Sequence, residues 1–473
     1  MKRASSADTP EDFIKRVHHA LRAWHAQNAE EMLDDLLLAQ RLQAERQAPP
    51  RLISNQILLN GIERLKQTSA EAADLLQRRF LDQETAQEVS YRRNLSEDIV
   101  FQRQRLAIAQ LAEIIWNQEQ ELRQEQRRRI ETRLESPTYT QLFGVADKLT
   151  EVRLRLETTT EPWLVSIEGL GGIGKTSLAD AAVRELAGGR HFREIAWVSA
   201  RRRLFQLSGE IEPLNHFPDL TFTELVDRCI DQFELASLRR QADSEKLAGL
   251  KDFLKAQTCL IVVDNLESAA NHQAFVSQVM SLVNPSKVLF TSRYSLRDVS
   301  GVSILTLKQL TRKDTLALVR HEAQTRGLPE LAQVSEKELG PIYEVTGGNP
   351  LATKLIVGQI HTLSLPTALA RFSQAKGKPV EELLDYLYAA AWQVLDDPAR
   401  QVLQAMLLVT EEGGRVEQIA AATELDEHTV ASCLHRLATL SLVNVGGTLQ
   451  ERRYALHQLT QAFVTQQAAN DSM

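Results

Sequence analysis

The chain has 473 residues, of which 43% are hydrophobic and 25% are charged. It is therefore long enough for about three domains and too apolar to be disordered throughout. Its 55 basic and 62 acidic residues leave a net charge of −7, so any contact with nucleic acid has to come from a local surface.

The cysteines and the apolar runs indicate the compartment. Cys229, Cys259 and Cys433 lie far apart and have no nearby cysteine or histidine partner, which argues against a disulfide framework or a zinc site. The first residues carry charge where a signal peptide needs an apolar run, and no stretch of about 18 uncharged apolar residues occurs. We expect a cytoplasmic protein that does not contact a membrane.

The order of sequence patterns predicts a multidomain α and α/β protein. Residues 11–135 contain a single glycine, Gly61, and are rich in good helix formers, which predicts an all-helical N-terminal region. After Ser136-Pro137, short β-branched runs alternate with helical patterns, as in a domain with a parallel sheet. The buried strands are expected at 163–168, 194–199, 259–264, 287–291 and, more weakly, 302–305.

Helical patterns return after residue 311. Residues 311–378 predict a small helical domain that is interrupted by a turn at 347–350. Helices are then expected at 397–409, 416–423 and 427–442, followed by two short strands around a Gly446-Gly447 turn, which is the pattern of a C-terminal winged helix. The expected domains are 1–68, 69–136, 137–308, 309–380 and 381–473.

A phosphate-binding loop follows the first strand. Residues 169–176 read GLGGIGKT, which satisfies G-x-x-x-x-G-K-[ST] between a strand and a helix. The glycines let backbone N–H groups surround phosphate oxygens, Lys175 reaches the β- and γ-phosphates, and Thr176 holds Mg²⁺. This pattern predicts a P-loop NTPase domain. The expected nucleotide-binding residues of this segment are Gly169, Gly171, Gly172, Ile173, Gly174, Lys175, Thr176 and Ser177.

The third strand ends in an acid, Asp264, after four aliphatic residues. About ninety residues after a P-loop, this carboxylate is expected to hold the water shell of Mg²⁺, although the same pattern also occurs where an acid only ends a strand. The next residue is Asn265, so the carboxylate that would most directly polarise an attacking water is absent from that position. We therefore expect slow ATP hydrolysis, which serves a switch rather than metabolism, with Lys175 and Asp264 as catalytic residues.

Arg293 follows the fourth strand in the sequence Thr291-Ser292-Arg293. Its guanidinium is expected to sense the terminal phosphate and to complete the catalytic set, because forked, permanently charged donors suit phosphate oxygens. The alternative is a surface salt bridge.

These motifs in this order resemble the NB-ARC branch of the STAND P-loop ATPases over about residues 137–470. The resemblance implies that Pro350, in GNPLA, lies against adenine, that Leu351 beside it also binds the nucleotide, and that His457 contacts the β-phosphate of ADP. It also implies that Leu142, Phe143 and Gly144 grip the base. For His457 the alternative is a partly buried core histidine.

Three departures limit what the resemblance implies. Val145-Ala146 stands where the family has Arg-Glu, and Gln458 stands where it has Asp. The chain also ends shortly after the expected winged helix, without the repeat sensor of most relatives. The family implies a switch that is closed with ADP and that self-associates with ATP, and a separate sensor or effector protein is expected.

The N-terminal region contains a second resemblance. Residues 71–115 are similar to the helix-turn-helix of region four of sigma factors, with Ser96 capping the second helix. In a DNA-reading version, the contacts would come from Arg92, Arg93, Gln102, Arg103 and Gln104. Against this, residues 76–135 hold 11 Arg and 11 Asp or Glu, a net charge of zero. The alternatives are a protein-docking module and a purely structural extension, and residues 1–68 predict no chemistry.

Together these patterns predict an ADP- and ATP-dependent switch in bacterial signalling or defence that regulates transcription through duplex DNA. The alternative is an oligomerising scaffold whose N-terminal helices recruit an effector protein. A third possibility is an ATP-consuming motor, against which Asn265 argues.

Overall fold

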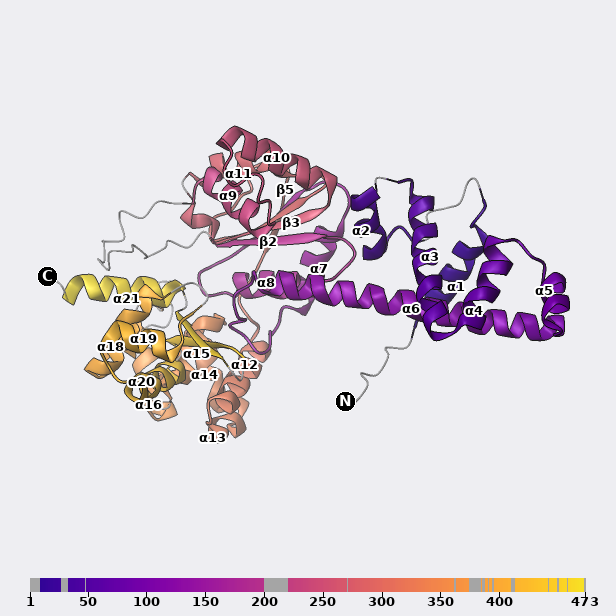
Figure 1. Cartoon of the computed structure of the whole chain (residues 1–473). Helices are drawn as coiled ribbons and strands as arrows, with labels where there is room; N and C mark the ends of the chain where they lie inside the picture. The colour runs from indigo at the N-terminus through magenta and orange to yellow at the C-terminus, as the bar shows by residue number, and fades with distance from the viewer. Residues whose placement is uncertain are drawn as a thin grey trace. The chain divides into compact units, whose positions relative to one another are not determined.

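The computed structural model describes all residues except 1–8, 27–32, 47, 200–219, 270, 361–362, 374–383, 385–387, 390, 394, 410–412, 441, 449–450, 457 and 472–473. It divides into two compact units. The first contains residues 1–129 with 188–190, and the second contains residues 130–187 with 191–473 (Figure 1). None of the helices formed by described residues is long and apolar enough to cross a bilayer.

The first unit is all-helical in its described part, as the composition predicts. Its elements are α1 (Glu11–Arg22), α2 (Leu37–Arg46), α3 (Pro50–Thr68), α4 (Ala70–Leu76), a π-helical turn (Gln77–Leu81), α5 (Ala86–Arg93) and α6 (Glu97–Glu131). The amphipathic helix α1 and the middle of α6 pack on α3, and a Cβ added to Gly61 would come within 2.7 Å of Leu111. The lone glycine of this region therefore permits close approach of α3 and α6.

Helices α5 and α6 are joined by a short turn. Thr85 and Glu88 form a capping box at the start of α5, and Asn94 ends the helix in the left-handed region with φ 50°. The Ser96 hydroxyl accepts a hydrogen bond from the Ile99 N–H at 3.4 Å, as expected of a cap. The helix-turn-helix order is thus present, whereas its use in DNA binding stays a prediction.

The second unit begins with a five-stranded parallel sheet in the order β2-β3-β4-β1-β5. The strands are β1 (Leu164–Glu168), β2 (Glu194–Ser199), β3 (Cys259–Asp264), β4 (Lys287–Ser292) and β5 (Val302–Thr306), which confirms the predicted α/β class. Strands β1 to β4 are buried along their whole length because helices cover both faces, whereas β5 is only partly buried.

Two sets of helices form these outer layers (Figure 1). Helices α7 (Ala146–Glu157) and α8 (Lys175–Leu186) share one core with the sheet. Helices α9 (Phe222–Gln232), α10 (Asp243–Ala256) and α11 (His272–Val279) share a second core with its other face. Short 3₁₀ turns occur at Leu266–Ser268 and Met280–Leu282.

The rest of the second unit is mostly helical. It contains α12 (Arg312–Thr325), α13 (Pro329–Gln333), α14 (Glu336–Thr346), α15 (Pro350–Gln359), α16 (Leu365–Ser373), α18 (Asp397–Ala405), a 3₁₀ turn (Met406–Leu408), α19 (Val416–Thr423), α20 (Glu427–Thr439) and α21 (Gln458–Asp471). An antiparallel hairpin of β6 (Val443–Gly447) and β7 (Arg452–Leu456) follows α20. Three helices and a hairpin match the element order predicted for a winged helix, whose assignment stays a prediction.

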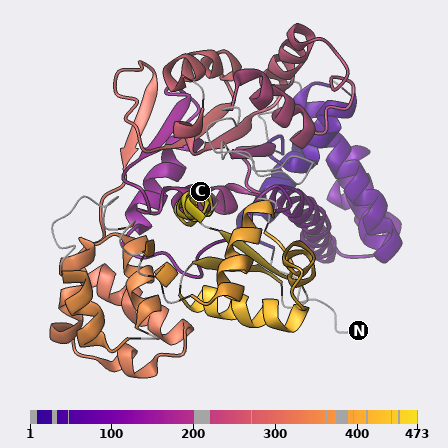
Figure 2. The same ribbon diagram turned by 90° about the vertical axis from the view of Figure 1, so that its left-hand side faces the viewer.

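One sequence expectation for this region needs correction. Gly446 and Gly447 lie inside β6, paired with Arg453 and Arg452, and so do not form the turn of the hairpin. The predicted boundary at residue 380 stays a prediction. One buried cluster from Leu316 to Val464 holds residues from both sides of it, and the two groups of helices lie side by side in the lower half of Figure 2. The helical and C-terminal regions therefore share one buried cluster.

Candidate functional site

The P-loop connects β1 to α8 in the predicted order. Gly172 and Gly174 have φ of 70° and 102°, a region that side chains other than glycine rarely adopt. A Cβ on Gly172 would also come within 2.8 Å of Leu351. The loop thus turns directly into the N-terminus of α8, where free backbone N–H groups and the helix dipole favour anions.

Lys175 is 8% exposed and lies within this loop. Its Nζ donates hydrogen bonds to the Gly169 carbonyl at 2.9 Å and to the Leu170 carbonyl at 3.0 Å. Burial lowers the pKa of Lys175 to about 8, against the opposing influence of Glu267. The ammonium group is therefore poorly solvated, and a negative partner such as a phosphate would favour its charged form.

Thr176 and Asp264 meet across the sheet, as predicted. The Thr176 hydroxyl donates to Asp264 Oδ1 at 2.8 Å, and the Thr291 hydroxyl donates to the same oxygen at 2.6 Å. Asp264 is 1% exposed. A hydroxyl and a carboxylate beside a phosphate loop match the oxygen donors that Mg²⁺ takes in nucleotide sites, so the residues present fit this ion.

Arg293 follows β4 and lines the same pocket as the P-loop. Its Nε lies 3.0 Å from Oε1 of Glu267, and its backbone N–H donates to Oε2 at 3.2 Å. The Glu267 side chain is only 10% exposed. The salt bridge considered as an alternative is therefore present, and it joins the exposed Arg293 to a mostly buried carboxylate. The sequence analysis did not single out Glu267.

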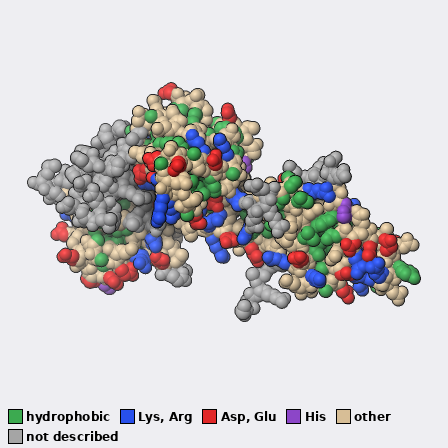
Figure 3. All heavy atoms as spheres, turned by 45° about the horizontal axis from the view of Figure 1, so that its top comes forward, with side chains coloured by type: hydrophobic (Ala, Val, Ile, Leu, Met, Phe, Trp, Pro, Cys, Tyr) green, Lys and Arg blue, Asp and Glu red, His purple; other side chains and the backbone are tan. Residues whose placement is uncertain are grey.

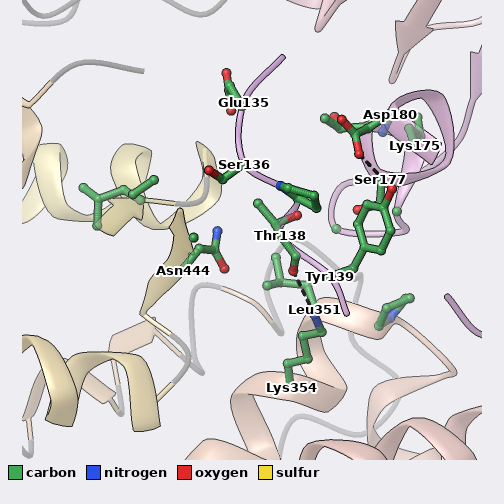
Figure 4. Close-up of a pocket in the computed structure, with 18 of the residues that line it drawn as sticks. Glu135, Ser136, Thr138, Tyr139, Lys175, Ser177, Asp180, Leu351, Lys354 and Asn444 are labelled. Carbon is green, nitrogen blue, oxygen red and sulfur yellow. Dashed lines mark hydrogen bonds between the residues drawn. The ribbon is translucent and has the colours of Figure 1, made fainter. Parts of the chain in front are cut away.

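The pocket is built by four parts of the second unit (Figure 4). These are the segment 135–139, the sheet domain, the start of α15 and the β6–β7 hairpin. Its lining includes Gly171, Gly172, Ile173, Gly174, Lys175, Thr176, Ser177, Trp197, Asn265, Arg293, Pro350, Leu351, Lys354, Asn444, Val445, Gly446, Arg453, Ala455 and Leu456. One cavity thus brings together residues that lie more than 300 positions apart in the sequence.

The segment 135–139 ties these parts together. Tyr139 donates its hydroxyl proton to Asp180 of α8 at 2.7 Å, and burial raises the pKa of Tyr139 (Figure 4). Lys354 of α15 donates to the Thr138 carbonyl at 3.5 Å. The Gly447 N–H of the hairpin donates to the Ser136 hydroxyl at 3.1 Å. Sequence reasoning placed only a domain boundary here, because no motif marks these residues.

Pro350 and Leu351 lie at the pocket, as the resemblance implies. Pro350 is the first residue of α15, and Asn349 caps this helix by accepting from the Ala352 N–H at 3.1 Å. The Asn349 amide also donates to the Gly171 carbonyl at 2.9 Å. Asn349, which is fully buried, therefore links the GNP turn to the P-loop, a role that the sequence analysis missed.

Leu142, Phe143 and Gly144 do not line the pocket, so the structure does not support their predicted grip on adenine. The Phe143 ring packs on His321 with centroids 5.4 Å apart. A Cβ on Gly144 would come within 2.8 Å of Asp314. This segment thus packs against α12, and residues 135–139 take the place at the pocket. His457 lies outside the described residues.

The residues predicted to contact DNA lie on α5 and α6. Gln104 is 8% exposed and accepts a hydrogen bond from Arg79 at 3.0 Å, so its prediction as a base-reading residue is wrong. Acids of the same unit pair with three arginines: Arg92 with Glu84 at 3.3 Å, Arg93 with Asp74, and Arg103 with Glu71 at 3.6 Å. Gln102 lies exposed on α6.

Parallel-sheet order, a glycine loop and a strand-end aspartate near the loop threonine define a P-loop nucleotide-binding domain. Residues 145–326 match the NB-ARC domain family. This part of the chain is an NB-ARC domain, as the motifs predict.

The chain is 24% identical over 252 residues to the disease resistance protein RUN1 of Vitis rotundifolia, which covers 52% of this chain and 18% of that protein. A STAND protein with a tetratricopeptide repeat sensor from Pyrococcus horikoshii is similar in structure, with a TM-score of 0.46 and 18% identity over 70% of this chain and 43% of that one. The ORC2 protein of Aeropyrum pernix gives a TM-score of 0.34 and 14% identity over 70% of this chain and 96% of that one. The chain therefore spans less than half of the first two proteins.

The lowered pKa of Lys175 makes nucleotide binding sensitive to pH. Phosphate oxygens favour the charged form, so binding above pH 8 requires uptake of a proton. We expect the affinity for ADP to be constant below pH 8 and to fall by up to about tenfold per pH unit above it. Titration with fluorescent mant-ADP between pH 7 and 9.5 measures this. An affinity that stays constant to pH 9.5 would contradict it.

Proposed function

We propose that this protein is a nucleotide-dependent molecular switch that is closed with ADP and assembles with ATP and Mg²⁺. The observation that carries the proposal is the composition of the pocket. The P-loop, the linker 135–139, the GNP turn and the C-terminal hairpin all line one cavity. A nucleotide in this cavity would touch both the sheet domain and the helical and C-terminal regions, together called the helical body. Whether ADP or ATP is bound can therefore change how stable the contact between these two parts is.

The shared core of the helical and C-terminal regions suggests which parts would separate. That body meets the sheet domain through a few polar links, among them Asn349 to Gly171 at 2.9 Å and Leu351 N–H to the Gly172 carbonyl at 3.3 Å. In the described part of the chain, the buried cluster from Leu316 to Val464 contains residues of both the helical and the C-terminal region and none of the sheet domain. We therefore propose that the helical body moves as one piece relative to the sheet domain.

The contacts at this site can supply the free energy that the switch requires. Changing the ratio of open to closed molecules from 1:99 to 99:1 requires a ligand that binds the open state about 5.5 kcal/mol more tightly than the closed state. Hydrogen bonds to charged groups contribute roughly 1.5 to 3 kcal/mol each. Arg293, Asn265 and a Mg²⁺ ion held by Thr176 and Asp264 together offer several such contacts to a γ-phosphate that ADP lacks.

The nucleotide that remains bound to the purified protein, identified by chromatography after denaturation, tests the proposal first. We expect ADP. Sedimentation velocity with ADP and with a non-hydrolysable ATP analogue plus Mg²⁺ tests the switch itself. We expect a monomer with ADP and a larger species with the analogue. Identical sedimentation in both, or no bound nucleotide and no affinity for one, would refute the switch.

For the N-terminal unit, we propose a protein effector as the partner. Acidic and basic side chains are interspersed on its visible face (Figure 3), in keeping with the zero net charge of residues 76–135. Large apolar side chains are exposed on α5 and α6, among them Tyr91 at 92%, Leu106 at 60% and Phe101 at 40%. Exposed apolar groups without excess positive charge suit a protein partner better than a phosphate backbone.

Binding to duplex DNA separates the two hypotheses. Fluorescence anisotropy with a labelled random duplex is measured at 50 and 200 mM salt, with ADP and with the ATP analogue. We expect no binding in any condition. Affinity that falls steeply with salt would instead support the DNA-contacting regulator.

A further inference from the structure

The sequence has Asn265 where a water-activating acid is expected, and the loop after β3 supplies a different carboxylate. Asp264 ends the strand, Asn265 takes the left-handed region with φ 72°, and a single 3₁₀ turn begins at Leu266. This tight turn brings Glu267 next to the residue that follows β4, Arg293. Because β4 lies between β3 and β1 in the sheet, this carboxylate is located at the phosphate end of the domain.

Two buried polar atoms of this turn have no hydrogen-bond partner among the described residues. They are Nδ2 of Asn265 and Oε1 of Glu267. Asn265 is 5% exposed and lines the nucleotide pocket. A buried donor without a hydrogen bond, such as the Asn265 amide, costs free energy that a bound polar group would recover, whereas Oε1 keeps only its ion pair with Arg293. The turn therefore holds one donor and one acceptor suited to such a group.

The two carboxylate oxygens of Glu267 contact Arg293 differently: one accepts a hydrogen bond and the other does not. Oε2 accepts the backbone N–H of Arg293 at 3.2 Å, which does not depend on where the guanidinium points. Oε1 lies 3.0 Å from Nε of Arg293 but accepts no hydrogen bond from it. The arginine side chain could thus leave for a phosphate oxygen while the backbone still holds the carboxylate.

We propose that Glu267 is the catalytic base for ATP hydrolysis and that Arg293 covers it until a γ-phosphate draws the guanidinium away. This inference rests on the proposed nucleotide switch and identifies the residue that would end its ATP-bound state by hydrolysis. Arg293 lines the pocket and Glu267 does not, so the ion pair separates the carboxylate from the cavity. Hydrolysis would then be slow until ATP draws Arg293 away from Glu267. The asparagine at position 265 would not prevent hydrolysis, because Glu267 supplies the carboxylate.

The proposed step balances as an in-line displacement. The water oxygen forms a bond to the γ-phosphorus while the bond from that phosphorus to the bridging β–γ oxygen breaks, and the electron pair of that bond leaves with ADP. The water proton passes to Oε1 of Glu267 and then to solvent. The Asn265 amide donates a hydrogen bond to the water or to a γ-phosphate oxygen. A bound Mg²⁺ would offset the charge on the phosphates.

The test uses the full chain and the variant Glu267→Gln, with Glu330→Gln, an exposed glutamate of α13, as the matched control. Release of labelled phosphate under single turnover gives the hydrolysis rate, and mant-ATP and mant-ADP give the affinities. We expect the rate of Glu267→Gln to fall at least about 100-fold, as for loss of a general base. We expect its ATP affinity to be equal to or above wild type, because Arg293 loses a competing partner.

The outcomes separate the proposals. A merely structural Glu267 that only positions Arg293 would lower the affinity for ATP together with the rate, and this result would overturn the inference. So would a rate within threefold of wild type, or a wild type that binds ATP without hydrolysing it, although the switch would stand in both cases. If Glu267→Gln does not bind mant-ADP, Glu267→Asp must bind it and keep an intermediate rate, and failure of both variants also overturns the inference. A wild type that binds neither nucleotide removes the proposed function itself.

Discussion

Replacing Lys175 with alanine should weaken the binding of both ADP and ATP by at least about 100-fold. Lys175 is buried in the P-loop and is hydrogen-bonded to the Gly169 and Leu170 carbonyls, from where its ammonium can reach phosphate oxygens. Two charge-assisted hydrogen bonds contribute about 3 kcal/mol or more, and each 1.4 kcal/mol is a factor of ten. Isothermal titration calorimetry measures the loss.

The free protein should tolerate this substitution, because burial already disfavours the charge and lowers the pKa of Lys175 to about 8. Nucleotide-induced stabilisation should disappear, whereas wild type should gain about 2.7 kcal/mol when ADP is present at 100 times its dissociation constant. Lys313→Ala, an exposed lysine of α12, serves as the control and should keep wild-type affinity. If Lys175→Ala bound ADP within tenfold of wild type, the phosphate role of this lysine would be wrong.

Replacing Arg293 with alanine should weaken ATP binding by about 10- to 100-fold and leave ADP affinity within about threefold of wild type. Arg293 lines the pocket after β4, and one charge-assisted contact to a γ-phosphate contributes about 1.5 to 3 kcal/mol. ATP-dependent assembly should fall in parallel, because the switch depends on this difference in affinity. Competition of ADP and ATP against mant-ADP measures the ratio.

Two controls separate the causes. Arg297→Ala removes an exposed guanidinium that does not line the nucleotide pocket and should behave as wild type. Arg293→Ala also leaves the Glu267 carboxylate without its ion pair, which would repel any phosphate. The double variant with Glu267→Gln removes that repulsion. If the double variant recovers wild-type preference for ATP, Arg293 only neutralises Glu267 and does not sense the γ-phosphate.

In the N-terminal unit, the local sequence correctly predicts where a helix begins but not which of its side chains are exposed. The sequence predicts a second helix capped by Ser96, and α6 begins there. It also predicts Gln104 at base edges, yet Gln104 is buried against Arg79 from the preceding segment. The face that a helix buries depends on what packs against it, and that partner is not encoded within the helix.

The sequence by itself determined the elements of the nucleotide domain. Four aliphatic runs, the glycine loop and the strand-end Asp264 follow from local rules of burial, turn geometry and spacing, and the structure has strands β1 to β4 at those positions. These signals are readable because each one depends on residues that are neighbours in the chain.

The tertiary structure decided which residues share the site. The strand order places β4 between β1 and β3, so Thr291 bridges to Asp264, and Arg293 both lines the P-loop pocket and pairs with Glu267. The linker 135–139, Asn349 and the C-terminal hairpin join them through contacts across up to about 300 residues. Pairing of this kind is set by long-range packing and not by local propensity, so neither Glu267 nor Tyr139 carries a sequence signal for its place.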